Sequence, residues 1–516
     1  MTNSANWTLT GASESPDSTT KLDQIPVQQG FSWPAGQGMF INGTNFHIDA
    51  LKGPNPIVTV GSGPANASNT CGIDLSQSTA SRLYIVTVPP SPNGEPGPQD
   101  IYVTNYPGGS SPASTLSVTD AITYVPAKTS DAPMIPVIFK NNTGQADDQV
   151  WVQFLNGYFG GGQTGAGGTV KLSGNKGYSL ADLTSALPGF PSLGSVANVS
   201  LNNFTNGRIY LNLGDTPLST TAGNQPQPGD KSDPDYLTQY AYVELNVFGN
   251  GSNNMDISNI DFFSFTVTAA TYKGGKLADQ LTSQDTSTLM TAIKKVAPAA
   301  ALVTDSAKDT VRVLGPGLAS GYHTWSEYMA FLENQTTKIA GTFGSDQPYD
   351  LTASFDSKTS VVTLSGTINS TTQTTITIPY SEMNAVTGVY GANPSYSVNG
   401  GPSVPFANDI YGWIVGDLVA GMNWGFPGSS TPVPGQTGKT MGQLTSSEWF
   451  STAVAHTSVQ FSGAQSNDDF YNTYAAANQP LTEAYGFPFT DRLGGVLLYF
   501  PPSGTGAVDY LEITLS

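Results

Sequence analysis

Positive charge is scarce in this chain of 516 residues. Lysine and arginine together number 19, against 38 aspartates and glutamates, so the formal net charge at pH 7 is −19. Nucleic-acid binding requires clustered cations that neutralise phosphates, and the sequence contains no such cluster. We therefore expect no nucleic-acid partner and favour a neutral one. The acidity also serves simply to keep a surface soluble, so the charge excludes partners without identifying one.

Cysteine and histidine are also nearly absent. Cys71 is the only cysteine, so the chain forms no intrachain disulfide and offers no zinc site of the cysteine type. The three histidines, His47, His323 and His456, are too widely separated for a metal-ligand motif or a Ser/His/Asp set. The sequence predicts no metal site.

Long apolar runs are missing as well. No segment approaches the roughly 18 apolar residues that a membrane-spanning helix needs. The first residues, Met1-Thr-Asn-Ser-Ala5, lack the charged and apolar regions of a signal peptide. We predict no membrane span, and no signal peptide is visible. The low lysine content and the polar, uncharged composition still favour an extracellular or cell-surface location.

Glycine and proline are abundant, at 57 and 36 residues, and with Ser, Thr and Asn they separate many short β-branched runs. This pattern is typical of β sandwiches and barrels with long loops. The length exceeds that of one ordinary domain. We expect a mainly β fold with two or three domains.

The N-terminal part divides into a tail and a small sandwich. Residues 1–22 are polar and aperiodic, which predicts a flexible tail. Residues 23–126 contain short strands separated by turns, the pattern of a sandwich of about 100 residues. Gly43-Thr-Asn-Phe46 and the run 100–110 resemble the immunoglobulin-like IPT/TIG domain. The resemblance implies a spacer or docking module, and self-association through this domain is a further possibility.

Two more regions follow a Pro- and Ser-containing linker. Residues 133–268 again show strand patterns, whereas 269–516 read as an α+β region with the first helices. The last strand, 508–515, is expected to return to the β framework. The expected helices run from the Thr324 capping box to Phe331, from Asn408/Asp409 to Asn423, and from Ser466 to Ala477.

Two acids lie inside apolar, strand-like runs, Glu244 and Asp261, which are 17 positions apart. In strand phase Glu244 shares a face with Tyr242, Asn246 and Phe248, while the alternate residues form an apolar face. Rings and amides around a carboxyl suit a sugar cleft, and two facing acids are the minimum for cleaving a glycosidic bond. Asp261 either heads a buried face or lies at its rim. Alternatively, each is a structural acid that pairs with Arg or caps a loop.

Several segments resemble one enzyme family. Val243–Val247 followed by Ser258–Phe263 is similar to the catalytic segment of laminaripentaose-producing β-1,3-glucanases, glycoside hydrolase family 64. The likeness spans about 133–516. Further similar segments follow in the same order, namely Val311–Pro316, the helix with Trp325 and Tyr328, Asn408–Asn423, Phe470–Tyr474 and Ala484–Gly495.

The resemblance implies a thaumatin-like β domain and an α/β subdomain that together form a wide groove. It also implies an inverting, endo-type cleavage of β-1,3-glucan without metal or organic cofactor. Matched by position, Glu244 would be the general acid and Asp261 the general base. In an inverting site the two carboxyls stand about 6.5–9.5 Å apart to admit water.

The sequence departs from the family beside the first acid. Where the family has a Thr and an Asn that contact sugar, this chain has Asn246 and Phe248. Asp256 is an alternative base. A non-catalytic glucan-binding or surface-structural protein on the same fold is therefore the competing hypothesis. The candidates for sugar contact are Tyr242, Asn246, Phe248, Trp424 and Asp491, the last having a surface ion pair with Arg492 as its alternative account.

Overall fold

The computed structural model divides the chain into two compact units, Met1–Ala132 and Pro133–Ser516. In the first unit the structure describes residues 8–13, 26–27, 39–44, 46, 56–60, 71–79, 82–87, 97–105 and 114–124. In the second it describes 134–516 except 156–157, 160–161, 203, 220–224, 248–252, 345, 392–393, 406, 408, 426–431, 434–436, 441–442, 450–469 and 502–506.

Strands dominate the described part of the first unit. One sheet has the order β1-β3-β6-β5 and the other β2-β8-β7-β4. Apolar side chains such as Ile41, Leu83 and Val103 are fully buried. The immunoglobulin-like identity of this unit stays a prediction. The strands are β1 (Thr8–Ser13), β2 (Pro26–Val27), β3 (Met39–Thr44), β4 (Ile57–Val60), β5 (Gly72–Thr79), β6 (Arg82–Thr87), β7 (Gly97–Asn105) and β8 (Ser114–Tyr124).

The predicted tail of residues 1–22 is wrong in part, because Thr8–Ser13 forms β1. This strand pairs antiparallel with β3, and the register shifts between Leu9 and Gly11. The Thr-Leu-Thr start of the segment has a high β propensity, and an edge strand needs only one partner. Composition alone does not reveal such a pairing, since the partner strand lies about 30 residues further on.

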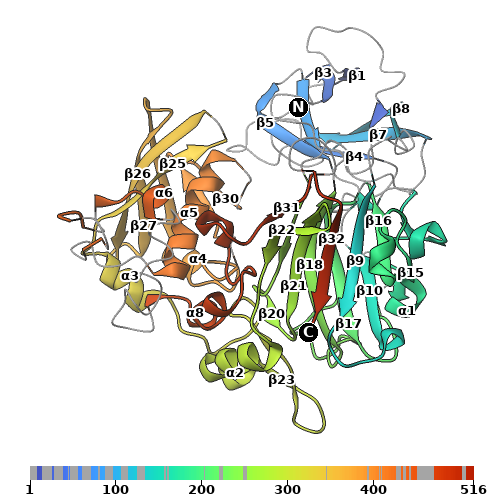
Figure 1. The fold of residues 1–516 in the computed structure, drawn as a ribbon. Coiled ribbons are helices and arrows are strands. Elements are labelled where there is room, and N and C mark those ends of the chain that lie inside the picture. Colours follow the sequence, from blue (N-terminus) through green and yellow to red (C-terminus); the bar gives the residue numbers. More distant parts are fainter. Residues whose placement is uncertain are drawn as a thin grey trace. The chain divides into compact units, whose positions relative to one another are not determined.

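The second unit contains a β sandwich of two large sheets (Figure 1). Their facing apolar side chains form one core that includes residues of β9, β10, β17, β18 and β32. The first sheet consists of β14 (Gly177–Ser179), β10 (Val150–Leu155), β17 (Phe204–Leu213), β18 (Gln239–Val247), β19 (Asn254–Ile257) and β31 (Leu498–Tyr499), with β11 (Tyr158–Phe159) beside β17. The second consists of β13 (Val170–Lys171), β12 (Thr164–Gly165), β16 (Ser195–Leu201), β9 (Ile135–Asn141), β32 (Tyr510–Leu515), β21 (Val267–Lys273) and β22 (Lys276–Leu281), with β15 (Thr184–Ala186) beside β16. The short helix α1 spans Leu180–Leu183.

The C-terminal strand closes this framework. β32 pairs in parallel with β9 and antiparallel with β21, so it lies between the first strand of the unit and a strand from its middle (Figure 1). Its pattern of three buried apolar residues, Leu511, Ile513 and Leu515, points into the sandwich core.

The alternation predicted for the strand with the first acid is confirmed. Ala241, Val243, Leu245 and Val247 face the sandwich core. Tyr240 and Tyr242 belong to a different core on the opposite face of the same strand. That second core also contains residues of α2 (Thr286–Val296), β20 (Phe262–Phe263), β23 (Leu302–Thr304) and β24 (Thr310–Leu314).

The α+β region is built on a meander whose strands follow the chain from β25 to β30. Its apolar face packs against α5, whose N-cap Asp409 accepts a hydrogen bond of 2.8 Å from Gly412 N. The elements are α3 (Ser326–Leu332), β25 (Thr337–Phe343), β26 (Gln347–Asp356), β27 (Val361–Ile368), β28 (Thr372–Pro379), α4 (Tyr380–Met383), β29 (Tyr396–Val398), β30 (Ser403–Val404), α5 (Ile410–Trp424), α6 (Ser446–Trp449) and α8 (Thr473–Asn478).

Two helix expectations need adjustment, and one further helix is present. α3 starts at Ser326 with Trp325 as its N-cap, and no side chain caps it, so the capping box at Thr324 is wrong. The third helix begins at Thr473 with Asn472 as N-cap, whereas Ser466–Asp469 lie outside the described residues. α2, capped by Asp285, was not expected. Its apolar Leu289 and Ile293 stand four apart, which is the spacing of a helix face.

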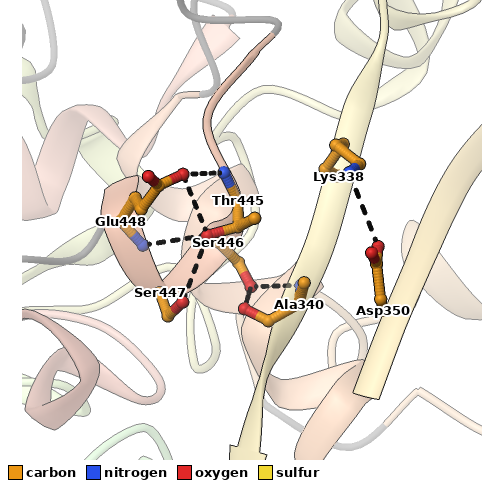
Figure 2. A network of polar contacts seen from close by, with 7 residues as sticks. All are labelled: Lys338, Ala340, Asp350, Thr445, Ser446, Ser447 and Glu448. Atoms are coloured by element: carbon orange, nitrogen blue, oxygen red, sulfur yellow. Dashed lines mark hydrogen bonds and ion pairs between the residues drawn. The ribbon is translucent and has the colours of Figure 1, made fainter. Parts of the chain in front are cut away.

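A short polar network ties α6 to the edge strand β25 (Figure 2). The Ser446 hydroxyl oxygen accepts a hydrogen bond of 2.8 Å from Ala340 N. Thr445 and Glu448 form a reciprocal cap, with Thr445 N donating to Glu448 Oε2 at 2.9 Å and Glu448 N donating to Thr445 Oγ1 at 3.2 Å. The network occupies backbone groups on an edge that otherwise offers pairing to another strand.

Candidate active site

Three charged residues form a row across neighbouring strands of the first sheet. Arg208 on β17 stands directly opposite Glu244 on β18, and Glu244 stands directly opposite Asp256 on β19. Directly opposed residues of antiparallel strands have Cβ atoms about 4.5–5.5 Å apart. The register of three strands therefore places two carboxyls side by side with one cation at the end of the row.

Arg208 holds Glu244 by two contacts on one oxygen. Its Nε donates to Glu244 Oε1 at 2.9 Å, and its Nη2 lies 2.8 Å from the same atom. A third guanidinium nitrogen, Nη1, donates to Gln225 Oε1 at 2.9 Å. The Glu244 side chain is 42% exposed, so it is fixed at one oxygen and still open to solvent.

Asp261 is held from the neighbouring position on β18. The Tyr242 hydroxyl donates to Asp261 Oδ2 at 2.8 Å, while Ser258 Oγ donates to the Tyr242 hydroxyl at 3.2 Å. Burial raises the pKa of Tyr242 well above its usual range, and the Asp261 charge adds to this effect. The phenol therefore stays protonated and acts as a fixed donor.

The backbone of Asp261 is anchored by close contact with a glycine. Gly315 N donates to Asp261 O at 2.7 Å. A Cβ atom at position 315 would stand 2.3 Å from Ile260 O, so only glycine permits this approach. Asp261 directly precedes β20, which pairs with β24. Its position is thus fixed at both the main chain and the carboxyl.

Asp256 is an acid whose pKa is strongly affected by its surroundings. Burial raises the pKa of its carboxyl well above the ordinary range, the charges of Glu244 and Asp491 raise it further, and Arg208 opposes them. Part of the residue remains accessible to solvent, but the carboxyl is crowded by its neighbours. A general base must be ionised, and these surroundings favour the protonated form of Asp256, so they do not favour it as an alternative to Asp261.

Asp491 reaches the same site from the 3₁₀ turn Thr490–Leu493. The chain before this turn runs beside Ile257, because Tyr485 N donates to Ile257 O at 2.8 Å and Asn259 N donates to Tyr485 O at 2.9 Å. Burial raises the pKa of Tyr485, and the nearby Asp491 adds to the effect.

The surface ion pair considered for Asp491 and Arg492 is wrong. Arg492 pairs instead with Asp417 of α5, with 3.3 Å between Nε and Oδ1. Both side chains are nearly inaccessible, at 8% and 3% exposed. Arg492 anchors the turn in the α+β region, and its neighbour Asp491 is thereby presented to the acid row.

The remaining candidates for sugar contact have different surroundings. Tyr242 is 1% exposed and serves Asp261 instead of lining an open face. Trp424 ends α5 at 3% exposed and packs on Phe487 with ring centroids 6.1 Å apart, so it belongs to the core. Asn246 is half-buried and donates to Asn254 Oδ1 at 3.1 Å. Phe248 lies outside the described residues.

Arg208 is the functional candidate that the sequence analysis missed. It is a cation in the apolar run Gly207-Arg-Ile-Tyr-Leu211, within a chain that has only 19 cations. The criterion that selected Glu244 and Asp261, a charge inside a hydrophobic strand, selects Arg208 equally well. Its partner Glu244 could not be predicted, because the residues around Arg208 do not determine the register in which its strand pairs with another strand.

Other features of the described residues lie apart from the row. A pocket at the opposite end of β17 and β18 is lined by Leu213–Thr216, Leu237–Gln239, Asp305 and Asp309–Val311. Within the described residues, no three His, Cys, Asp or Glu side chains are grouped to hold a metal ion. No helix in this part of the chain has the length and apolarity to cross a membrane.

A family model settles the class of protein. The model described as Beta-1,3-glucanase, glycoside hydrolase family 64, matches residues 133–493. The protein is a glycoside hydrolase. More particularly, the chain belongs to glycoside hydrolase family 64, the β-1,3-glucanases, and its second unit carries the family match.

Solved structures of the same family are distant matches. A β-1,3-glucanase domain from Clostridium beijerinckii is 13% identical with a TM-score of 0.47, and the match covers 75% of this chain and 98% of that one. A laminaripentaose-producing β-1,3-glucanase in complex with laminaritetraose is 16% identical with a TM-score of 0.45, covering 74% and 99%. The Paenibacillus barengoltzii enzyme complexed with laminarihexaose is 13% identical with a TM-score of 0.40, covering 94% and 99%. No curated protein matches the chain.

Proposed function

We propose that this protein cleaves β-1,3-glucan within the chain and with inversion, using Glu244 as general acid and Asp261 as general base. The single observation that carries the proposal is the connected tract of Arg208, Glu244, Tyr242 and Asp261, in which each carboxyl has its own fixed donor. Two placed carboxyls are what glycosidic cleavage requires, and in the inverting mechanism the second one activates a water molecule.

Asp261 suits the role of base. A general base must be ionised and correctly oriented, and the Tyr242 hydroxyl donates to one of its oxygens. Because this hydrogen bond holds Oδ2 in place, it also sets the position of the second oxygen, Oδ1. In the reaction this carboxylate takes a proton from water as the water oxygen bonds to the anomeric carbon.

Glu244 suits the role of acid because its side chain is open to solvent and can approach the glycosidic oxygen. As the bond between the anomeric carbon and this oxygen breaks, the departing oxygen keeps the electron pair and receives the proton of Glu244. Attack from the opposite side of the ring inverts the anomeric configuration. No metal or organic cofactor takes part in this scheme.

Sugar positioning is assigned to neighbours of the acids. Asn246 follows Glu244 on the same face of β18, and its amide can bond a hydroxyl in place of Asn254. Asp491 can accept from a hydroxyl beside Asp256. We also place the enzyme outside the cell, since an insoluble polymeric substrate does not enter one; cell fractionation tests this.

Product analysis tests the function. The full chain is incubated with laminarin and with curdlan, and products are followed by chromatography and by proton NMR of the anomeric signals. We expect short oligosaccharides whose first-formed anomer is α, and a loss of at least 1,000-fold in kcat for Glu244→Gln and Asp261→Asn. A first-formed β anomer overturns inversion, and binding without products establishes the non-catalytic alternative.

A further inference from the structure

We infer that Asp256 is a positioning residue for the general acid, and that Asp256 and Glu244 form one coupled carboxyl pair that stores the proton given to the leaving group. This inference rests on the proposed role of Glu244. It assigns a function to an acid that is directly opposed to Glu244 in the sheet register.

The reason for a second acid lies in the contact that Glu244 already makes. Two N–H groups of Arg208 point at Glu244 Oε1, a geometry that suits a carboxylate. A general acid must instead carry a proton before the bond breaks. A neighbouring carboxyl that holds this proton resolves the conflict between the two requirements.

Asp256 has the surroundings of such a proton carrier. Three charged groups act on its carboxyl, namely Glu244 from β18, Arg208 from β17 and Asp491 from the 3₁₀ turn. Two tyrosines are also near. Tyr485 lies in the chain segment beside β19, and Tyr499 of β31 stands opposite Asn254. Among the described residues its carboxyl makes no ion pair, because the one cation of the row contacts Glu244. Burial first, and then the two acids, raise its pKa.

Two adjacent carboxyls lose their protons in two steps that belong to the pair. Between these steps the pair carries one proton, which resides mainly on Asp256 while Glu244 remains with Arg208. During cleavage the single proton of the pair passes from Asp256 to Glu244, and Glu244 gives it to the departing glycosidic oxygen. Asp261 takes one proton from water in the same event. Afterwards Asp261 releases its proton to solvent and the pair takes one up, so the cycle balances.

Asp256→Asn tests the inference through the pH profile. The amide keeps the shape of the side chain but stores no proton and carries no charge, so Glu244 is left with Arg208 alone. We expect the alkaline limb of kcat/KM on laminarin to move to lower pH by about one unit or more. On the acid side of that limb, where Glu244 itself takes up a proton, the loss of kcat/KM should be smaller than on the alkaline side. A uniform loss at all pH values, or an unmoved limb, overturns the inference.

Glu512→Gln is the matched control. Glu512 is also a largely buried acid, at 7% exposed, but it lies on β32 of the other sheet and pairs with Lys140 at 2.7 Å. Removing its charge should leave the alkaline limb in place. Thermal melting of both variants checks that each is folded at the pH values used.

A second measurement does not depend on turnover. In protein with ¹³C-labelled aspartate, the Asp256 carboxyl signal is identified by its loss in Asp256→Asn, and its titration is followed in the Glu244→Gln variant. We expect its midpoint to move to lower pH when the neighbouring charge is gone. An unchanged midpoint overturns the coupling between Asp256 and Glu244, but not the proposed role of Glu244 as general acid. Full activity of Glu244→Gln would instead overturn the proposed general acid, so the two failures are distinct.

Discussion

Arg208 lies over the ring of Tyr242, with its guanidinium carbon 4.3 Å from the ring centroid. The first residue holds Glu244 and the second holds Asp261. One stacked pair thus connects the two acids to which we assign catalysis. Because Arg208 and Tyr242 belong to adjacent strands, the sheet fixes the positions of the two donors that hold the acids.

Tyr242→Phe should lower kcat while leaving the fold intact. The ring remains packed between Tyr210 and Phe262, and what is lost is the hydrogen bond to Asp261 together with the one that the hydroxyl accepts from Ser258. A hydrogen bond to a charged group contributes about 1.5–3 kcal/mol, which corresponds to a kcat lower by about 10- to 100-fold. Initial rates on laminarin measure this, with KM expected within about threefold. Tyr210→Phe is the control, since the Tyr210 hydroxyl contacts Gln225 and not an acid; equal losses would contradict the prediction.

Arg208→Lys should reduce kcat and weaken the connection between Glu244 and Asp261 that runs through Arg208 and Tyr242. An ammonium cannot make the two contacts to Glu244 together with the bond to Gln225. We expect a loss of about tenfold. The double variant with Tyr242→Phe should lose less than the product of the single losses, because residues in direct contact, as Arg208 and the Tyr242 ring are, do not act independently. Strictly multiplicative losses in a double-mutant cycle would show that the two acids are held independently.

Asp256 should make stability fall as pH rises. A carboxyl whose pKa is raised in the folded state binds its proton more tightly there than in the unfolded chain. The stability it contributes is therefore complete below the ordinary pKa of an aspartate and is lost as pH rises through the raised value. Urea unfolding between pH 4 and pH 8 should show a decline that is shallower in Asp256→Asn, by at most about 1.4 kcal/mol per pH unit. Parallel curves would contradict the raised pKa.

Breaking the buried pair of Asp417 and Arg492 should destabilise the second unit strongly. The Tyr349 and Ser446 hydroxyls also donate to Asp417 Oδ2, at 2.6 and 3.0 Å, so Asp417→Ala removes the partner of three buried groups. We expect the free energy of unfolding to fall by about 3–5 kcal/mol. Replacing both residues, as in Asp417→Leu with Arg492→Met, should recover part of this loss.

The control for that pair is Lys439→Met. Lys439 contacts Glu448 at 2.9 Å on the surface, where the two side chains are 32% and 46% exposed. Such a pair contributes at most about 1 kcal/mol. If the surface variant and Asp417→Ala lower the stability equally, Asp417 does not have the structural role assigned to it.

Cys71 should be inert until the first unit unfolds. It is 4% exposed, and burial raises the pKa of its thiol to about 12. The thiolate is the reactive form, so an aromatic disulfide reagent at pH 8 should label the folded protein at least 100-fold more slowly than the urea-unfolded chain. As the only cysteine, it reports on this unit alone. Rapid labelling of the folded protein would contradict the burial.

Local pattern predicted much of the framework. Helix α5 was expected from the cap at Asp409, and the strand expected over 508–515 does return to the β framework. Strand β1 was missed because its partner supplies the stabilisation. The start of α3 was misplaced because Trp325, a buried aromatic without a capping side chain, occupies the N-cap. In both cases tertiary contacts outweighed local propensity.

The sequence by itself determined the face of each residue on β18. A strand has a side-chain period of two, so Val243 and Leu245 had to point away from Glu244 and Asn246. The tertiary structure decided what each side chain meets. The layer containing α2 and β20 buries Tyr242 and turns it from a sugar platform into the donor to Asp261. Strand register sets Arg208 against Glu244, and the turn after Tyr485 brings Asp491 to Asp256. These partners are tens to hundreds of residues apart, and only the pairing of distant strands and turns brings them within contact.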